Sequence, residues 1–169
     1  MQIAAKQLLD GLRESADMVF SMMMTVNPAD VVCSKTVCES DDCTSPNSSS
    51  EDQFDLEAVV GFQGVPSGAV VLRCCSEGAE RITRMLLMID DDEPISFEDI
   101  KDALGECANM VTGTLKTRLL DPNGDFELST PFIAARVSVG HQHQAGKLVY
   151  ELKSGAVAIE IWLSEECPE

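Results

Sequence analysis

One stretch of the 169-residue sequence places side chains that could do chemistry at a regular spacing. Glu106 and Asn109 lie three positions apart, a spacing that makes side chains neighbours on the surface of a helix. A carboxylate can form a charge-assisted contact with a cation. A side-chain amide can accept one hydrogen bond and donate another while it stays neutral. The pair could therefore bind a cation and hold a small polar molecule such as water.

The residues around this pair predict the helix that would hold it. Apolar side chains recur at three- and four-residue steps, which places them on one face of a helix over residues 96–120: Ile100, Leu104, Cys107, Val111 and Leu115. Ser96 and Asp99 match the pattern of a capping box, in which each side chain bonds the backbone of the other. The turn residues at 121–124 are typical of a helix stop.

The opposite face of this helix is polar and contains glycine. At about 100° per residue, the side away from the apolar stripe holds Asp102, Glu106, Asn109, Gly113 and Lys116. Gly105 and Gly113 lie on or beside this face, and each costs the helix roughly 0.8–1 kcal/mol relative to alanine. Two interpretations are open. The face could be solvated and merely tolerate glycine, or glycine could let another molecule approach closely.

The segment from Asp102 to Lys116 resembles the signature helix of the CheC/CheX/FliY phosphatases, and most closely that of CheX. That family carries Glu-x-x-Asn in a helix that continues through small residues and glycine. Glu106, Asn109, Gly113 and Lys116 fall on this pattern, and the order of elements fits over most of the chain. The resemblance implies that Asn109 positions the water that hydrolyses an aspartyl phosphate, while Glu106 contacts a lysine of the partner.

The partner implied by the resemblance is a phosphorylated response regulator of the CheY type. The regulator would hold the Mg²⁺ ion itself, so this chain is expected to bind no metal and no cofactor. Asp102, Gly105, Gly113 and Lys116 would contact the regulator, with the glycines leaving room for its loops. CheX proteins pair through their sheets, so a homodimer is expected as well.

Two other functions stay open at this point. The first is a non-catalytic module on the same scaffold that binds a response regulator without turning it over. The second is a structural part of a larger assembly, such as the flagellar switch, which uses related folds. A regulator whose phosphate lifetime is unchanged by bound protein would favour the first, and expression as a free protein would count against the second.

Charge and composition exclude several other classes. A chain of 169 residues with 44% apolar content fits one domain over residues 1–169 with a sizeable core. The net charge of −17 opposes binding to nucleic acids and to anionic membranes. We expect a cytoplasmic protein, because the sequence has no signal-peptide pattern and no apolar run of about 18 residues. Residues 39–53 are acidic and serine-rich and should form a mobile loop.

Cysteine and carboxylate patterns give no metal site. The seven cysteines form no Cys-x-x-Cys pair, and with His141 and His143 they do not match the usual spacings of zinc ligands. Free thiols in a reducing compartment are expected instead. The acidic run at residues 90–93 lacks the alternating acids and the glycine of an EF-hand loop, so it should be a solvated linker.

The remaining patterns predict an α+β, CheC-like fold. We expect helices over residues 4–24 and 77–89, the latter capped by Ser76, and strands over residues 31–37, 54–64, 69–75, 126–139, 147–152 and 156–163. The order α-β-β-β-α-α-β-β-β favours an antiparallel sheet of about six strands with three helices on one face. Glu14 and Asp17 in the first helix resemble a second Glu-x-x-Asn. Because Asp lacks the amide's donor hydrogens, we expect an exposed acidic pair there.

Overall fold

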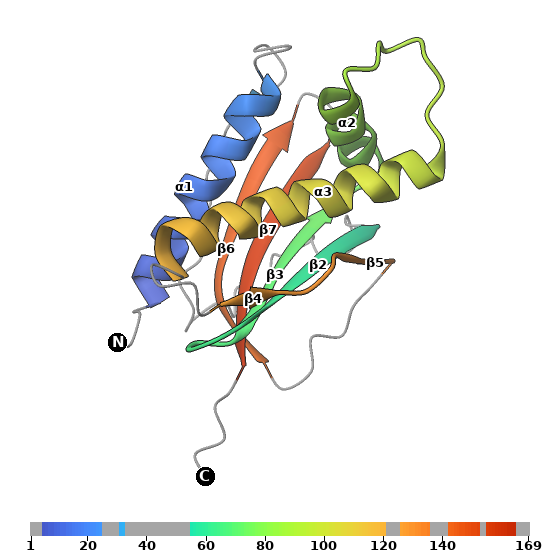
Figure 1. The fold of residues 1–169 in the computed structure, drawn as a ribbon. Helices are drawn as coiled ribbons and strands as arrows, with labels where there is room; N and C mark the ends of the chain where they lie inside the picture. Colours follow the sequence, from blue (N-terminus) through green and yellow to red (C-terminus); the bar gives the residue numbers. More distant parts are fainter. Residues whose placement is uncertain are drawn as a thin grey trace, which may run out of the picture.

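The computed structural model describes residues 5–24, 31–32, 55–120, 126–135, 142–152 and 155–164. These residues form three α-helices, one π-helical turn and an antiparallel sheet of seven strands, with the helices on one face of the sheet (Figure 1). The helical elements are α1 (Ala5–Met24), α2 (Ser76–Leu87), α3 (Phe97–Leu115) and η3 (Lys116–Leu120). The strands are β1 (Val31–Val32), β2 (Leu56–Gln63), β3 (Gly68–Cys74), β4 (Glu127–Leu128), β5 (Phe132–Ala134), β6 (Gln142–Leu152) and β7 (Ala156–Ser164).

The sheet has the strand order β1-β6-β7-β3-β2-β4, and β5 also pairs with β2. The strands expected over residues 54–64 and 69–75 are present as β2 and β3, and they form a hairpin with Leu56 opposite Cys74 and Phe62 opposite Gly68. Strands β6 and β7 form a second hairpin, whose register shifts between Gln144 and Gly146. All strand pairs are antiparallel, so the α+β fold expected from the sequence is confirmed.

The segment predicted as one strand over residues 126–139 differs from that prediction. Its described part forms two short strands, β4 and β5, which both pair with β2. Pro131 lies between them and has no N–H to donate to a ladder, which explains the break. Ser129 bridges the break, because its backbone N–H donates to the Gly61 carbonyl and its hydroxyl accepts from the Gly61 N–H, each at 2.9 Å.

Two further boundaries differ from the sequence-based expectation. Helix α2 is capped by Cys75, whose Sγ accepts a hydrogen bond from the Gly78 N–H at 3.4 Å. The predicted cap, Ser76, is the first helical residue, because its N–H and hydroxyl both donate to Asp55. Strand β6 begins at Gln142, earlier than the predicted start at residue 147.

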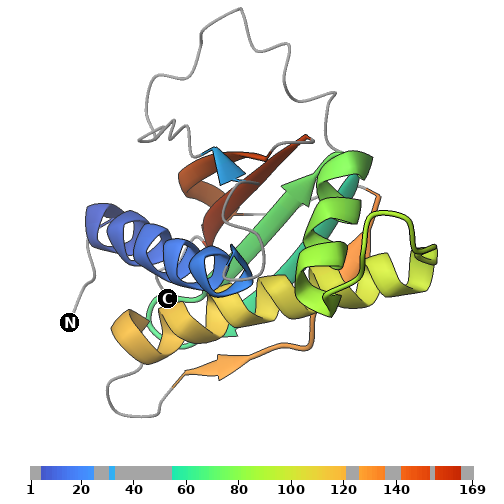
Figure 2. The ribbon, with the colours of Figure 1, turned by 90° about the horizontal axis from the view of Figure 1, so that it is seen from above.

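The core lies between the helices and the sheet. Helix α3 crosses the strands, with α1 packed beside its C-terminal part and α2 beside its N-terminal part (Figures 1 and 2). The apolar stripe of α1 is buried, and it includes Leu8, Leu12, Val19 and Phe20. The Phe20 and Tyr150 rings lie 4.9 Å apart between centroids and join α1 to β6. None of the helices in the described ranges is long and apolar enough to span a membrane.

Several predictions fall outside the described residues. They concern the loop at residues 39–53, the helix stop at 121–124, the continuation of the first strand beyond Val32, and His141. Of the seven cysteines, Cys74, Cys75 and Cys107 are described, and all three are buried free thiols.

Candidate functional site

Helix α3 begins with the predicted capping box. The Asp99 N–H donates to the Ser96 hydroxyl at 3.2 Å, and the Ser96 N–H donates to the Asp99 carboxylate at 2.9 Å. These contacts satisfy two backbone donors that a helix start leaves unpaired. The hydrogen bonds from Ser96 lower the pKa of the Asp99 carboxyl. The cap therefore holds the start of α3 in place.

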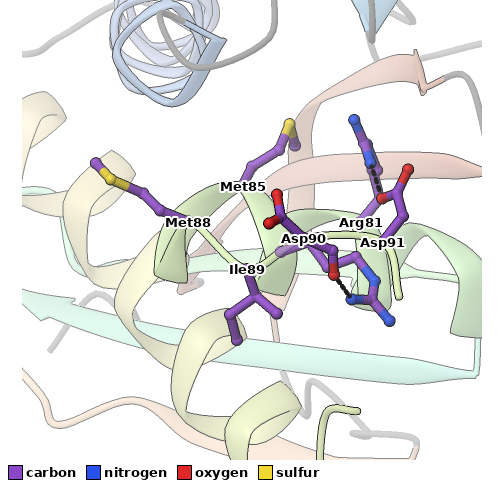
Figure 3. A pocket seen from close by; sticks show the side chains of 7 residues that line it. Arg81, Met85, Met88, Ile89, Asp90 and Asp91 are labelled. Carbon is purple, nitrogen blue, oxygen red and sulfur yellow. Dashed lines mark hydrogen bonds and ion pairs between the residues drawn. The ribbon is translucent and has the colours of Figure 1, made fainter. Parts of the chain in front are cut away.

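The linker before α3 is anchored as well. Arg81 forms an ion pair with Asp91 at 3.0 Å (Figure 3). Arg84 donates hydrogen bonds to the carbonyls of Asp90 and Glu93. The predicted solvated acidic run is exposed, yet two arginines of α2 bind it. The small hollow that these residues line has a volume of about 190 Å³. The contacts of these two arginines connect α2 to the linker that precedes α3.

The apolar face of α3 is buried, which fixes the direction of its polar face. Leu104, Cys107, Val111 and Leu115 are fully buried, and the half-buried Ile100 packs against the same core. Burial raises the pKa of the Cys107 thiol to about 12, so this cysteine stays a protonated core residue. The helix therefore has no freedom to rotate its polar side inward.

The opposite face carries the predicted site residues to the surface. Asp102 and Glu106 are exposed, while Asn109, Gly113 and Lys116 are half-buried. In the part of the chain that the structure describes, the Glu106 and Asn109 side chains form no hydrogen bond or ion pair with other residues. Adjacent turns of one helix bring their Cβ atoms to within about 5–6 Å. The carboxylate and the amide are thus side by side and available to another molecule.

The two glycines of α3 have different surroundings. A Cβ atom built on Gly113 would meet no atom within 4 Å, so the surface there is open. Gly105 is buried, and a Cβ on it would lie 3.3 Å from the Pro131 Cβ and 3.5 Å from Ile133 Cδ1. The sequence-based expectation directed both glycines toward a partner. The structure places only Gly113 on the open face, while Gly105 makes room for the segment between β4 and β5.

The end of α3 departs from the continuous helix expected up to residue 120. The Lys116 N–H donates to the carbonyls of Thr112 and Gly113, and residues 116–120 form the π-helical turn η3. This turn packs against α1 at Gly11, where an added Cβ would lie 2.8 Å from Leu119 Cδ2. The turn thus brings Leu119 into close contact with α1.

The Glu14 and Asp17 pair is bound within the chain. The Glu14 carboxylate lies 3.0 Å from the Arg118 guanidinium of η3. Asp17 is half-buried and accepts a hydrogen bond from the Tyr150 hydroxyl at 3.0 Å. The expectation of an exposed pair therefore holds for Glu14 and is wrong for Asp17. Both carboxylates join α1 to other elements.

Sequence reasoning missed the methionines beside this face. Met22 is 51% exposed, and Met18 on the same helix is 43% exposed. Together with Met110 of α3 they line a groove of about 470 Å³. Their positions four residues apart on α1 were the available signal, because that spacing puts both on one side of the helix.

No group of three His, Cys, Asp or Glu side chains within the described ranges is arranged to hold a metal ion. The polar face of α3 thus offers one amide, carboxylates and a lysine. These groups can orient a water molecule and bind a cation of a partner. They lack an activated nucleophile of the Ser-His or Cys-His type.

The family model for the chemotaxis phosphatase CheX matches residues 56–153 of the chain, a range that includes all of α3. The structure of a CheX chemotaxis protein from Desulfovibrio desulfuricans is similar, with a TM-score of 0.67, 20% identity, and coverage of 94% of this chain and 99% of that chain. No curated protein sequence matches the chain.

Two other solved structures share the fold. CheX in a complex with CheY, BeF3 and Mg²⁺ from Borrelia burgdorferi has a TM-score of 0.67 at 14% identity, covering 92% of this chain and 97% of that chain. The FliM middle domain from H. pylori has a TM-score of 0.53 at 12% identity, covering 92% of each chain. These likenesses extend across nearly the whole chain.

Proposed function

Because the chain belongs to the CheX family, we propose that it hydrolyses the aspartyl phosphate of a CheY-like response regulator. The observation that carries the proposal is the pairing of Glu106 and Asn109 on the outward face of α3. Glu106 is exposed, Asn109 is half-buried, and neither side chain is engaged by another residue within the described ranges. The complex of CheX with CheY from Borrelia burgdorferi supports the choice of partner.

Asn109 is the residue that we assign to the water. An aspartyl phosphate is already activated, so its hydrolysis mainly requires a water molecule in line with the leaving oxygen. The Asn109 amide oxygen can accept a hydrogen bond from that water, and its NH₂ group can donate to the phosphoryl group. A neutral amide does this at any physiological pH, whereas a carboxylate could not donate.

Glu106 is the residue that we assign to docking. Its carboxylate would form a charge-assisted hydrogen bond with a lysine at the regulator's phosphorylation site. That contact orients the complex and places Asn109 over the phosphoryl group. The regulator would hold the Mg²⁺ ion, which supplies the charge stabilisation of the phosphoryl group. This chain would bind no metal of its own.

The rest of the polar face would form the contact surface around this pair. Asp102 lies one turn before Glu106 and is exposed, so it can meet a second cation of the regulator. Gly113 leaves open space one turn beyond Asn109, which lets the regulator's backbone approach. Lys116, at the end of α3, can meet an acidic surface. A cytoplasmic location follows from the proposal, since its substrate would be a cytoplasmic regulator.

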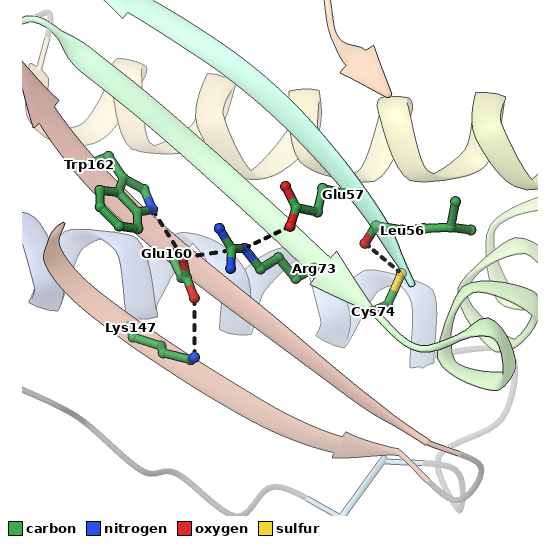
Figure 4. Close-up of polar contacts among 7 residues, drawn as sticks. All are labelled: Leu56, Glu57, Arg73, Cys74, Lys147, Glu160 and Trp162. Atoms are coloured by element: carbon green, nitrogen blue, oxygen red, sulfur yellow. Dashed lines mark hydrogen bonds and ion pairs between the residues drawn. The ribbon is translucent and has the colours of Figure 1, made fainter. Parts of the chain in front are cut away.

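We also infer a homodimer that forms through the sheet. Within the described residues, β1 pairs only with Glu151 and Leu152, so most of the outer edge of β6 is not paired with another strand there. The face of the sheet turned away from the helices carries a cluster of ion pairs together with Trp162 (Figure 4). Both features leave the helical face free for the regulator. Analytical ultracentrifugation would measure the mass, and a monomer at micromolar concentration would contradict the dimer.

The phosphatase proposal is tested by measuring phosphate release. Each CheY-type regulator encoded in the same genome is phosphorylated, and its phosphate lifetime is measured with and without this protein. We expect the protein to shorten the lifetime catalytically for at least one regulator. A protein that binds a regulator but leaves its phosphate lifetime unchanged would instead be the non-catalytic binding module.

A further inference from the structure

A groove beside the Asn109 face opens between α1 and the end of α3. Its volume is about 470 Å³, and its lining includes Met18, Met22, Met110, Gly113 and Thr117. Met18 and Met22 expose 43% and 51% of their surface, and with Met110 they line one continuous hollow instead of lying scattered as single apolar residues. We call this hollow the methionine groove.

The polar groups of the methionine groove already have partners. Arg118 at its rim is paired with Glu14 at 3.0 Å. The Thr114 and Thr117 hydroxyls donate to the carbonyls of Met110 and Gly113 at 2.8 and 2.9 Å. The groove therefore offers mainly an apolar and polarisable surface. Flexible methionine side chains adapt to different apolar shapes, which suits them to binding another protein.

The methionine groove is continuous with the proposed catalytic face. Gly113 lines the groove and lies four residues after Asn109, which corresponds to about 6 Å along the helix axis. A stable protein interface covers about 800 Å² on each partner. A protein whose phosphoryl group reaches Asn109 therefore extends over the groove. No side chain in the described part of this chain lies within 4 Å of a Cβ atom built on Gly113, so the approach to the groove is open there.

We propose that the methionine groove receives an apolar side chain of the same response regulator whose phosphoryl group meets Asn109. The inference rests on the proposed function and assigns to Met18, Met22 and Met110 the affinity for the regulator, while Asn109 serves the reaction. A second copy of this chain is a poorer occupant, because it would cover Gly113 and block the adjacent Asn109.

The test places one charge in the groove. The probe is the set of CheY-type regulators from the same genome, loaded with beryllium fluoride and Mg²⁺ as a stable phosphoryl mimic. We expect Met22→Lys to weaken their binding about tenfold or more, because a lysine there would be desolvated in the complex. Met22→Leu keeps the groove apolar and should bind within about threefold of the wild type. Val65→Lys changes an apolar side chain that is even more exposed, at 71%, in the turn between β2 and β3 outside the groove, and it should bind like the wild type.

Two readouts separate this inference from the phosphatase proposal. If Met22→Lys binds the loaded regulator as tightly as the wild type while turnover is normal, the groove assignment is overturned and the phosphatase stands. If Met22→Lys weakens binding but the wild type hydrolyses no phosphoryl group, the groove stands and the phosphatase fails. A Met22→Lys protein that loses self-association and keeps its regulator affinity would show that a second copy occupies the groove, which also overturns the inference. Met18→Lys repeats each comparison from the neighbouring turn of α1.

Discussion

Pro131 packs against Gly105 so closely that a Cβ atom on the glycine would lie 3.3 Å from the Cβ of the proline. The contact joins the segment between β4 and β5 to the flank of α3, one turn before Asn109. This close packing explains why glycine, which has a poor helix propensity, occupies position 105 in the middle of α3. Gly113, two turns later, has no such neighbour. The same residue type thus serves an internal contact at one position and leaves a surface open at the other.

The two glycines should respond differently to alanine. Gly113→Ala removes backbone freedom from the unfolded chain and meets no atom, so it should raise the free energy of unfolding by roughly 0.4–1 kcal/mol. Gly105→Ala gains the same helix propensity but must displace Pro131, so its gain should be smaller or become a loss. Urea titration of both variants measures the difference. Equal stabilisation by the two substitutions would contradict the packing argument.

Asn109→Ala should abolish the proposed phosphatase activity and leave the fold intact. The side chain is half-buried at the surface of α3 and is not bonded to other described residues, so its loss costs little stability. We expect the accelerated phosphate release to fall by about 100-fold or more, since misplacement of a reactant has costs of that order. Gln63→Ala, which removes an exposed amide from the end of β2, is the matched control. Undiminished phosphate release by Asn109→Ala would remove Asn109 from the reaction.

Glu106→Gln should act on affinity more than on turnover. The substitution keeps the size of the side chain but loses the charge that would bind a lysine, a contact worth about 1.5–3 kcal/mol. The regulator concentration for half-maximal rate should therefore rise by about tenfold or more, and binding should depend less on salt. Glu80→Gln changes an exposed carboxylate of α2 and serves as the control. A fall in the maximal rate without any change in affinity would instead assign Glu106 to the chemistry.

The parts of the fold that follow from local patterns were predictable. The three- and four-residue apolar spacing and the cap of Ser96 with Asp99 identified α3, the direction of its polar face and the position of Glu106 and Asn109. The resemblance to CheX rested on the same residues, and the family match confirms it. Alternation between apolar and polar residues indicated β2 and the second half of β6.

The parts that depend on distant residues were not predictable. Asp55 accepts hydrogen bonds from the N–H and the hydroxyl of Ser76, 21 positions away, while Cys75 caps α2. Tyr150 draws Asp17 inward across 133 positions. Neither contact can be predicted from the nearby sequence, because each one depends on a residue that is distant in the chain and close only after folding.

The cap of α3 should contribute a pH-dependent part of the stability. Its hydrogen bonds from Ser96 lower the pKa of Asp99 in the folded state below its ordinary value of 3.8. A lowered folded-state pKa means that the carboxylate stabilises the fold above about pH 3.8 and loses this effect as the pH falls through the lower folded value. The stability difference between the wild type and Asp99→Asn should therefore be constant near neutral pH and shrink below about pH 3.8. Thermal unfolding of both proteins from pH 7 to pH 2 would measure this difference, and a difference that grows toward low pH would contradict the assignment.

Arg73→Met should be among the most destabilising single changes on the sheet. The Arg73 Nε atom lies 3.4 Å from Glu57 and 3.5 Å from Glu160, whose side chains are 5% and 2% exposed. Removing the guanidinium leaves Glu57 buried without this cation, and breaking a buried pair from one side costs about 3–5 kcal/mol. Lys147→Met should cost less, because Glu160 also accepts a hydrogen bond from the Trp162 indole and keeps its contact with Arg73. Chemical denaturation would rank the two variants. If Lys147→Met proved the more damaging, Lys147 rather than Arg73 would be the main counter-charge of this face, and the cluster would be organised around β6 instead of β3.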